Sequence, residues 1–499
     1  MKCCKKHCLT IFGRSYKHEK IFWTAFEKFI CTQYNLENYS DNNRCRSCYF
    51  VKVEIAKMGK KNSNIVCKFG GTSCANAQNI LKVEEIISSN KNRKFIVVSA
   101  PGKRSTTDIK ITDMLYTCHN ALMTTGNCDA IFGQIAERFL AIAHDLQIGN
   151  IQLILEETRQ DIYRHKSLDF TASRGEYLNA ICIAKRLNLP FIDAKDIIFF
   201  NEQNTLDENR TYTAIATKLK GLQGAIIPGF YGTDVKGNIK TFSRGGSDIS
   251  GAILARGVNA SIYENWTDVD AFLVCDPNIV ENPQKISMLS FQELRELSYM
   301  GANVLHADCI FPLIDTNIMI NIRNTFNPNC SGTDIVQVKD TQKTENVITG
   351  IAGKKDFTIL HIEKAMMNTE VGFVHKVLSL IKEENISFEH MPSGIDMISL
   401  VIESKLLQGE RKVRLLEKIE REVRPDCLKV IENIALIAIV GHGMQGTIGS
   451  ASRVLQAISK ANINIRIIDK SSGELNIIVG VNNADYAKSI QALYAEFFD

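Results

Sequence analysis

The chain has 499 residues, enough for roughly two to four domains. Apolar residues make up 45% and charged residues 23% of it, an ordinary globular composition that argues against disorder and fibrous repeats. Residues 1–62 hold 13 Lys/Arg and 5 Asp/Glu, which leaves 46 and 50 for the other 437 residues, and the net charge is +4. This mildly acidic body carries no basic stripe for nucleic acid. No apolar run approaches the roughly 18 residues that span a membrane.

Residues 1–62 differ from the rest of the chain. They hold six of the fifteen cysteines, among them a Cys45-Arg-Ser-Cys48 pair. Such a pair can bind zinc, but a second clean pair is missing, and Lys and His interrupt any signal-like apolar segment. We expect a poorly ordered extension, or a start site placed upstream of the true one at Met58. The other nine cysteines are scattered, which favours a reducing, cytoplasmic setting.

The body opens with a pattern typical of a phosphate-binding turn. An apolar run at residues 64–67 leads into Lys68-Phe-Gly-Gly-Thr-Ser73 and then a helical pattern. In a strand–glycine–helix unit the backbone N–H groups point at an anion, and Lys68 can neutralise charge on a transferring group. The two hydroxyl residues are expected to cap the helix. The spacing is not that of a Walker loop, and a Gly-Gly turn alone is often only structural.

Two further segments place polar side chains at strand or helix ends. The strand expected at residues 94–100 contains Ser99, and the loop after it reaches Thr112. Both would stand at the carboxyl end of a strand, where open α/β sheets bind ligands. Ser173-Arg-Gly-Glu176 is expected to open a helix, where Glu176 could also serve only the helix dipole.

The segment Phe242-Ser-Arg-Gly-Gly-Ser-Asp248 is the most informative. Arg244 can grip a carboxylate with two hydrogen bonds, whereas Asp248 and Glu176 can hold an ammonium group. Together they would suit an amino acid. A strand expected at residues 262–268, which ends in Thr-Asp, and the Asp276-Pro277 pair follow.

These segments together resemble the aspartate kinases of the amino-acid kinase family. The resemblance covers everything except the extension and implies an α/β fold: a three-layer αβα kinase domain followed by two ferredoxin-like α+β ACT domains. The matching segments occur in the family's order and are Lys68–Ser73, Ser173–Glu176, Arg244–Asp248, Trp266–Val269 and Gly301–His306.

The resemblance also implies a role for each matching residue. The residues implied in catalysis are Lys68, Arg244 and Asp248. Those implied in binding aspartate are Ser99, Thr112, Glu176, Arg244, Ser247 and Asp248. Those implied in binding ATP are Lys68, Gly70, Gly71, Ser73, Thr267, Asp268 and Asp276.

The family's reaction explains why no catalytic triad is needed. The β-carboxylate of aspartate is already ionised at neutral pH, so catalysis reduces to positioning and charge neutralisation. Mg²⁺ would accompany ATP, and no dense cage of protein metal ligands is expected. Many members have Arg and Lys where this chain has Asn278 and Asn303. Each change removes a positive charge near a polyanion, which affects ATP affinity rather than the type of reaction.

The tail contains a dinucleotide-type fingerprint, Gly441-His-Gly-Met-Gln-Gly446, after an apolar run at residues 434–440. Only 53 residues follow it, too few for a doubly wound dinucleotide domain. An internal repeat explains the tail better. Its first copy has strands expected at 358–362, 385–389 and 398–402 with a helix after Gly372, and its second copy has strands expected at 434–440, 462–466 and 474–479 with a helix after Gly449.

The two copies resemble the paired ACT domains that follow many aspartate kinase domains. This resemblance implies regulation by an amino acid, with lysine as the leading candidate, and a homodimer formed through the ACT domains. The residues implied in binding the effector are Met367, Gly372, Phe373, Ser393 and Asp396.

We therefore expect an ATP:L-aspartate 4-phosphotransferase that begins the synthesis of lysine, threonine and methionine. The expected domains are an extension (1–62), a kinase domain (63–340) and two ACT domains (353–425 and 432–499). A glutamate kinase is a rival, which the phosphate loop and the repeat disfavour. A second rival is an amino-acid-sensing pseudokinase, motivated by Asn278 and Asn303.

Overall fold

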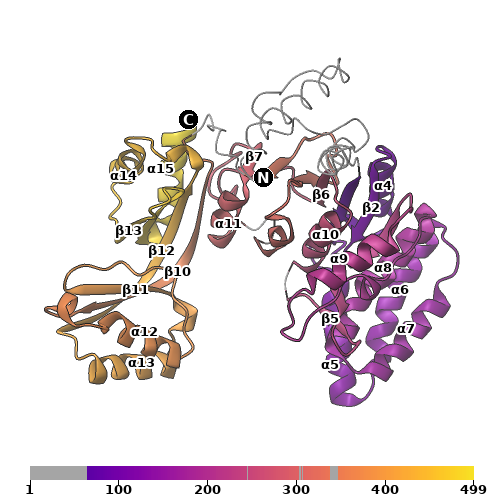
Figure 1. Cartoon of the computed structure of the whole chain (residues 1–499), viewed down its shortest axis with the longest axis horizontal. Helices are drawn as coiled ribbons and strands as arrows, with labels where there is room; N and C mark the ends of the chain where they lie inside the picture. The colour runs from indigo at the N-terminus through magenta and orange to yellow at the C-terminus, as the bar shows by residue number, and fades with distance from the viewer. Residues whose placement is uncertain (1–63, 244, 303–304, 306, 338–346) are drawn as a thin grey trace, which may run out of the picture. The chain divides into compact units, whose positions relative to one another are not determined.

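The computed structural model describes residues 64–243, 245–302, 305, 307–337 and 347–499 (Figure 1). Residues 62–499 form one compact unit. Residues 1–63, Arg244 and Asn303 are outside the described ranges, so the predictions made for them are not addressed by the structure. Within the described ranges, the helices are too short or too polar to cross a membrane.

The first part of the unit is built on a seven-stranded sheet of order β3-β2-β1-β6-β8-β9-β7. Neighbouring strands are parallel except at the β8–β9 pair. The strands are β1 (Ile65–Phe69), β2 (Arg93–Val98), β3 (Ala225–Pro228), β6 (Ile262–Thr267), β7 (Met288–Ser290), β8 (Met319–Asn324) and β9 (Thr333–Val336), and β4 (Tyr231–Thr233) pairs with β5 (Ile239–Thr241) as a hairpin.

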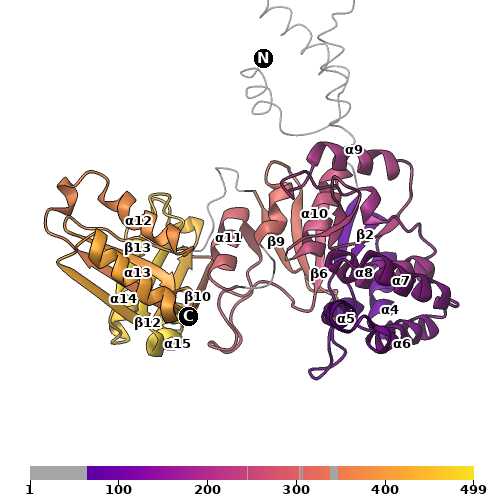
Figure 2. The same cartoon turned by 90° about the horizontal axis from the view of Figure 1, so that it is seen from below.

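Helices cover both faces of this sheet (Figure 2). Alternate residues of β1 face opposite ways: Cys67 and Phe69 pack with α4, α6 and α8, whereas Val66 packs with α9 and α10. Burial on both faces is typical of a parallel sheet, and it confirms the expected three-layer kinase fold. The helices are α4 (Ala77–Ser88), α5 (Ile111–Thr125), α6 (Asp129–Leu146), α7 (Gln152–His165), α8 (Leu168–Leu187), α9 (Glu208–Lys218), α10 (Gly246–Gly257) and α11 (Phe291–Tyr299), with 3-10 turns η1 (Thr72–Cys74), η2 (Ala194–Asp196) and η3 (Ala307–Leu313).

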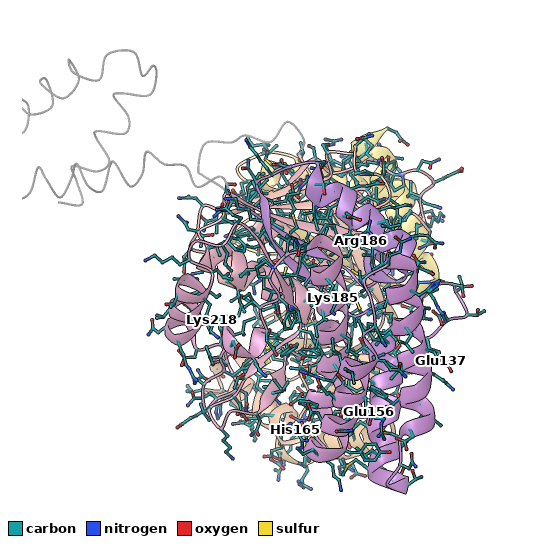
Figure 3. All side chains as sticks on the ribbon, turned by 90° about the vertical axis from the view of Figure 1, so that its right-hand side faces the viewer. Glu137, Glu156, His165, Lys185, Arg186 and Lys218 are labelled. Carbon is teal, nitrogen blue, oxygen red and sulfur yellow. The ribbon has the colours of Figure 1, made fainter. Side chains whose placement is uncertain are left out.

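Arg186 fixes the carboxyl end of α8, where Figure 3 labels it. Its Nε donates to Glu84 Oε2 of α4 at 2.8 Å, and its Nη1 donates to the carbonyl of Leu146 in α6 at 3.1 Å. These contacts hold α8 against two neighbouring helices. Because α8 also carries Glu176, its fixed position matters for the site.

The second part of the unit is a five-stranded antiparallel sheet of order β11-β10-β12-β14-β13. Its strands are β10 (Gly350–Glu363), β11 (Met397–Glu403), β12 (Cys427–Val440), β13 (Ile467–Lys470) and β14 (Asn476–Asn482). Its helices are α12 (Phe373–Glu383), α13 (Gly409–Glu422), α14 (Ser450–Lys460) and α15 (Tyr486–Phe498), with 3-10 turns η4 (Met367–Thr369), η5 (Ser404–Leu406), η6 (His442–Met444) and η7 (Asn483–Asp485).

The long strands β10 and β12 are shared by both halves of this sheet. Residues 357–363 of β10 pair with 427–434 of β12, whereas residues 350–354 pair with 436–440. The second half of the sheet thus uses a segment that precedes the first repeat. The two repeats therefore share strands: β10 and β12 each run through both halves of the sheet.

The two repeats share a backbone framework. Gly372 (φ 85°) and Gly449 (φ 89°) each precede an 11-residue helix, and Asn385 (φ 53°) and Asn462 (φ 54°) each follow it. The strands expected at 385–389 and 462–466 are wrong for this reason: the left-handed asparagine still belongs to the turn. In the second repeat the strand starts later, at Ile467, and in the first the pairing with β11 is limited to isolated bridges.

Candidate active site

The turns after β1 and β2 cross each other backbone to backbone. The Gly70 N–H donates to the carbonyl of Trp266 at 3.0 Å, and the Gly102 N–H donates to the carbonyl of Gly71 at 2.8 Å. A Cβ at Gly102 would stand 2.7 Å from the Gly71 carbonyl carbon, closer than atoms pack without displacement. Glycine is required here for the close approach. The resulting edge presents backbone rather than side chains, as a phosphate cradle needs.

The helix after this turn is capped differently from the expectation. The 3-10 turn η1 intervenes, and α4 begins at Ala77 with Asn76 as its N-cap, whose side chain accepts from the Asn79 N–H at 2.9 Å. Thr72 and Ser73 therefore do not cap the helix. Ser73 is buried instead, and its hydroxyl lies 2.8 Å from the Thr325 hydroxyl, just beyond β8.

Lys68 and Asp248 form an ion pair at the carboxyl edge of the sheet. Lys68 Nζ of β1 lies 2.6 Å from Asp248 Oδ1 in the first turn of α10, and both side chains are largely buried. Ser247 precedes Asp248 and packs against Gly229, where a Cβ would lie 2.7 Å from the serine Cβ. The structure thus brings together three of the residues predicted for the site, from segments 180 positions apart.

Glu176 lies inside α8, not at a helix start as expected. The helix begins at Leu168, with Ser167 as its N-cap accepting from the Phe170 N–H at 3.3 Å. The N-cap Ser167, six residues before Ser173, was the missed signal. A dipole role for Glu176 is therefore excluded, because the effect is confined to the first turn.

Burial raises the pKa of Glu176 to about 8. The backbone N–H of Ala100 donates a hydrogen bond to the carboxylate and partly offsets this rise in pKa. Its Oε2 is buried and has no hydrogen-bond partner among the described residues, and the same holds for Oδ1 of Asn179, one turn further along α8. The other end of the Asn179 amide donates to the Ser99 carbonyl at 2.7 Å. Two unsatisfied acceptors next to the end of β2 are suited to the ammonium group of a ligand.

Arg138 anchors the loop between β2 and α5, a role that the sequence did not reveal. Its guanidinium is buried and donates to the carbonyls of Ile109 (2.7 Å) and Gly102 (2.8 Å). It also lies 3.6 Å from Asp108, whose pKa Arg104 holds well below its usual range. This loop leads directly into α5, so its anchor also sets the position of Thr112 in the first turn of that helix.

The residues predicted to contact ATP lie in two places. Thr267 ends β6, its hydroxyl donates to Asp268 at 3.2 Å, and its carbonyl accepts from the Thr325 N–H at 2.9 Å. It therefore lies at the same sheet edge as Ser73. Asp276 accepts from the backbone and side-chain amides of Asn278 at 2.9 and 2.8 Å. Burial raises the pKa of Tyr486 in α15, and the Asp276 carboxylate adds to the rise. Among the described residues, the side-chain hydrogen bonds of Asp276 thus stay within its own turn, at Asn278, and do not reach Lys68.

The two loops predicted to bind an effector lie against each other. Asp396 Oδ1 accepts from the Met366 N–H, and the Asp396 carbonyl accepts from the Lys364 N–H, both at 2.8 Å. Phe373 begins α12, is buried, and has the Lys364 ammonium 5.3 Å from its ring centre. Met367 is buried in η4, Gly372 is the N-cap of α12, and Ser393 bridges to Ile398 of β11.

Comparisons with known proteins agree with this architecture. Residues 64–324 match the amino acid kinase family, and residues 437–497 match an ACT domain. The chain is 37% identical over 450 residues to aspartokinase 3 of Bacillus subtilis (strain 168), covering 87% of this chain and 98% of that one. It is 27% identical over 474 residues to the chloroplastic aspartokinase 1 of Arabidopsis thaliana, covering 89% and 82%.

Solved structures give the same result. The Clostridium acetobutylicum aspartate kinase matches with a TM-score of 0.84 and 48% identity, over 87% of this chain and 100% of that one. E. coli aspartokinase III in complex with aspartate and ADP matches with a TM-score of 0.70 and 23% identity, over 88% and 100%, a likeness of fold. The family match over more than half of the chain and the 37% identity to a full-length relative are decisive: this chain belongs to the amino acid kinase family, among its aspartokinases.

Proposed function

We propose that the chain transfers the γ-phosphoryl group of ATP to the β-carboxylate of L-aspartate and forms 4-phospho-L-aspartate. This reaction would begin the synthesis of lysine, threonine and methionine through the diaminopimelate route. The observation that carries the proposal is the Lys68–Asp248 ion pair, 2.6 Å long and largely buried, beside the Gly70–Gly71 turn. It supplies a cation for phosphate oxygens and an anion for an ammonium group at one sheet edge.

In this proposal Lys68 neutralises the charge that develops on the transferring group, and backbone amides of the glycine turn hold the phosphates. The tight crossing of the two turns at Gly71 and Gly102 fits such a cradle. Mg²⁺ carried by ATP would supply further positive charge to the phosphates beside Lys68 and the glycine turn. Ser73, Thr267 and Asp268 lie beside this edge and are proposed ATP contacts, and Asp276 remains a proposed one.

Aspartate would be held by charges of both signs. Glu176 and Asp248 are proposed to bind its ammonium group, and Arg244 its carboxylate, with Ser99, Thr112 and Ser247 as further contacts. Because burial raises the pKa of Glu176 to about 8, its carboxyl group carries a proton at pH 7 before aspartate binds. An arriving ammonium group favours the ionised carboxylate. Aspartate binding at pH 7 should therefore release a proton, which calorimetry in buffers of different ionisation enthalpy would detect.

We further propose that lysine regulates the enzyme through the loops at residues 364–373 and 393–396, and that two copies associate through the ACT domains in the cytoplasm. Lysine is bound in the solved T-state complex of E. coli aspartokinase III. Apolar side chains stand exposed around these loops: Met366 is 67%, Val371 101% and Ile395 70% exposed. A group of exposed apolar side chains of this kind is typical of an interaction surface. The domain bounds 63–340, 353–425 and 432–499 remain a proposal.

ADP release from Mg-ATP with L-aspartate, with L-glutamate and across a lysine titration tests these points together. We expect turnover that depends on aspartate, is absent with glutamate and falls as lysine rises. Lysine binding without turnover would instead favour an amino-acid sensor that has lost its chemistry. A chain beginning at Met58 should match the full chain in activity if residues 1–62 are dispensable.

A further inference from the structure

Asn265 joins the two charged residues of the candidate site. It lies in β6 directly beside Lys68 of β1 in the parallel register, and it is only 2% exposed. Its Nδ2 donates to Asp248 Oδ1 at 2.9 Å, and its Oδ1 accepts from Lys68 Nζ at 3.4 Å. One amide thus contacts both members of the ion pair.

The chemistry of the three groups fixes how this amide is oriented. An ammonium group only donates hydrogen bonds, and an ionised carboxylate only accepts them. A side chain that bridges both must offer an acceptor to one and a donor to the other. Asn can do so without a charge of its own, whereas Leu offers neither and Asp cannot donate when ionised.

The same strand holds the helix that carries Asp248. Tyr263, two residues before Asn265 and on the same face of β6, donates its hydroxyl to the backbone carbonyl of Asp248 at 3.0 Å. Its ring packs against Gly251 of α10, where a Cβ would lie 2.5 Å from the tyrosine oxygen. Strand β6 therefore holds Asp248 twice: Tyr263 holds its backbone and Asn265 holds its carboxylate.

The ion pair between Lys68 and Asp248 must open when substrates bind, provided that the proposed function holds. Lys68 is then needed at the phosphate oxygens and Asp248 at the ammonium group of aspartate, so they can no longer neutralise each other alone. As the Lys68 ammonium moves away, Asp248 loses the cation with which it pairs among the described residues. The Asn265 donor is part of the rigid sheet and does not depend on that movement.

We propose that Asn265 is a positioning residue, which keeps the Asp248 carboxylate in place while Lys68 engages ATP. It acts through Asp248 and Lys68 and does not touch the reacting atoms. The inference predicts an unequal effect on the two substrates, because the amide's donor serves the aspartate side and its acceptor serves the ATP side.

Two variants separate these sides. Asn265→Leu removes the donor and the acceptor, and should raise the KM for aspartate by roughly 10- to 100-fold, the usual effect of leaving a buried charged group without its partner. The KM for ATP should change less, because Lys68 is then free of a competing acceptor. Asn265→Asp keeps the shape but places a second carboxylate beside Lys68, so it should raise both KM values.

The matched control is Asn321→Leu in the neighbouring strand β8. Asn321 is also buried and also donates to a carboxylate, Asp334 Oδ1 at 2.6 Å. This variant should lower the melting temperature without changing the ratio of the two KM values. Steady-state kinetics and thermal unfolding of the full-length parent and the three variants give the answer.

The inference is overturned if the parent turns over aspartate and both Asn265 variants keep each KM within about threefold of it. It is equally overturned if Asn265→Leu shifts the two KM values by the same factor, as a general loss of stability would. If Asn265→Leu does not fold, Asn265→Asp decides alone: KM values that both stay within about threefold of the parent's in a folded Asn265→Asp overturn the inference. A parent without turnover would overturn the proposed function, and this inference with it.

Discussion

The edge of the kinase sheet and the loops of the ACT sheet that we propose to sense an effector use side chains in opposite ways. At the kinase edge the chemically important groups are buried: Lys68 is 8%, Asn265 2% and Glu176 5% exposed. In the loop at residues 364–373 the outward side chains are apolar and open, and Val371 is fully exposed. The kinase edge hides charge, whereas the sensing loops expose hydrophobic surface.

The difference follows from what each region has to do. A charge in a buried, low-dielectric site acts strongly on a transferring phosphoryl group, but it must be held by fixed partners. We expect a sensing loop to change its contacts when an effector or another copy binds, and exposed apolar side chains provide the surface for such new contacts. The following predictions test that contrast, beginning with the largest effect.

Lys68→Met should reduce kcat/KM by roughly two to three orders of magnitude, the usual loss when a charge-stabilising donor is removed. Asp248 keeps the hydrogen bond from Asn265, so the fold should survive, and circular dichroism would check this. The control is Lys218→Met, which removes an exposed lysine that pairs with Asp196 at 3.2 Å. Full activity of Lys68→Met would refute the assignment of the site.

Glu176→Gln should weaken aspartate binding by roughly tenfold or more, because it loses the carboxylate that the ammonium group needs. It should also stabilise the empty protein at alkaline pH. The folded-state pKa of Glu176 is about 8, above the usual value for glutamate, so the native state holds a proton that the unfolded chain releases. Native stability therefore falls as pH rises from about 4.5 to 8.

Thermal unfolding at pH 5 and pH 8.5 without ligands measures this effect. The melting temperature of Glu176→Gln relative to the parent should rise between the two pH values. Glu137→Gln, which alters an exposed carboxylate on α6 (Figure 3), should show no such rise. A pH-independent difference for Glu176→Gln would mean that the carboxyl group is not protonated in the empty site.

Asp396→Ala should raise the lysine concentration for half-inhibition by roughly tenfold, because the Met366 N–H loses a charge-assisted hydrogen bond that joins the two loops. Glu474→Ala is the matched variant in the second repeat, where Glu474 Oε2 accepts from the Gly446 N–H at 2.7 Å. In lysine titrations, the concentration for half-inhibition should shift more in Asp396→Ala than in Glu474→Ala. Equal shifts would place the effector in both repeats, contrary to the proposal.

Gly372→Ala and Gly449→Ala should each cost about 1 kcal/mol, the usual penalty for a side chain in the left-handed conformation. The two costs should be equal, since the φ angles are 85° and 89° and neither position has a neighbour within 4 Å of an added Cβ. Gly133→Ala inside α6, which is also open, should stabilise the protein by about 0.5–1 kcal/mol. Denaturant titrations would measure the free energy of unfolding of each variant. Unequal losses of stability in Gly372→Ala and Gly449→Ala would show that the two repeats are not equivalent at these positions.

Local sequence patterns predicted the fold and part of the site because each depends on neighbours along the chain. The strand before Lys68 and the turn at Gly70 were predictable because a parallel strand is a short apolar run and only glycine suits a close backbone approach. Asn265 and its neighbour Glu264 are polar residues in a buried strand, which was a usable signal. The start of α8 was misplaced because the N-cap Ser167 was overlooked.

Sequence by itself thus determined the family and the order of its elements, and it predicted which short segments carry the chemistry. Tertiary structure alone decided which partners these residues have: Lys68 meets Asp248 and Asn265, Ser73 meets Thr325, and Arg138 holds the loop before α5. The physical reason is the distance along the chain over which each effect acts. Propensity and periodicity act over a few residues, whereas burial, ion pairing and the pKa of Glu176 depend on segments that only folding brings together.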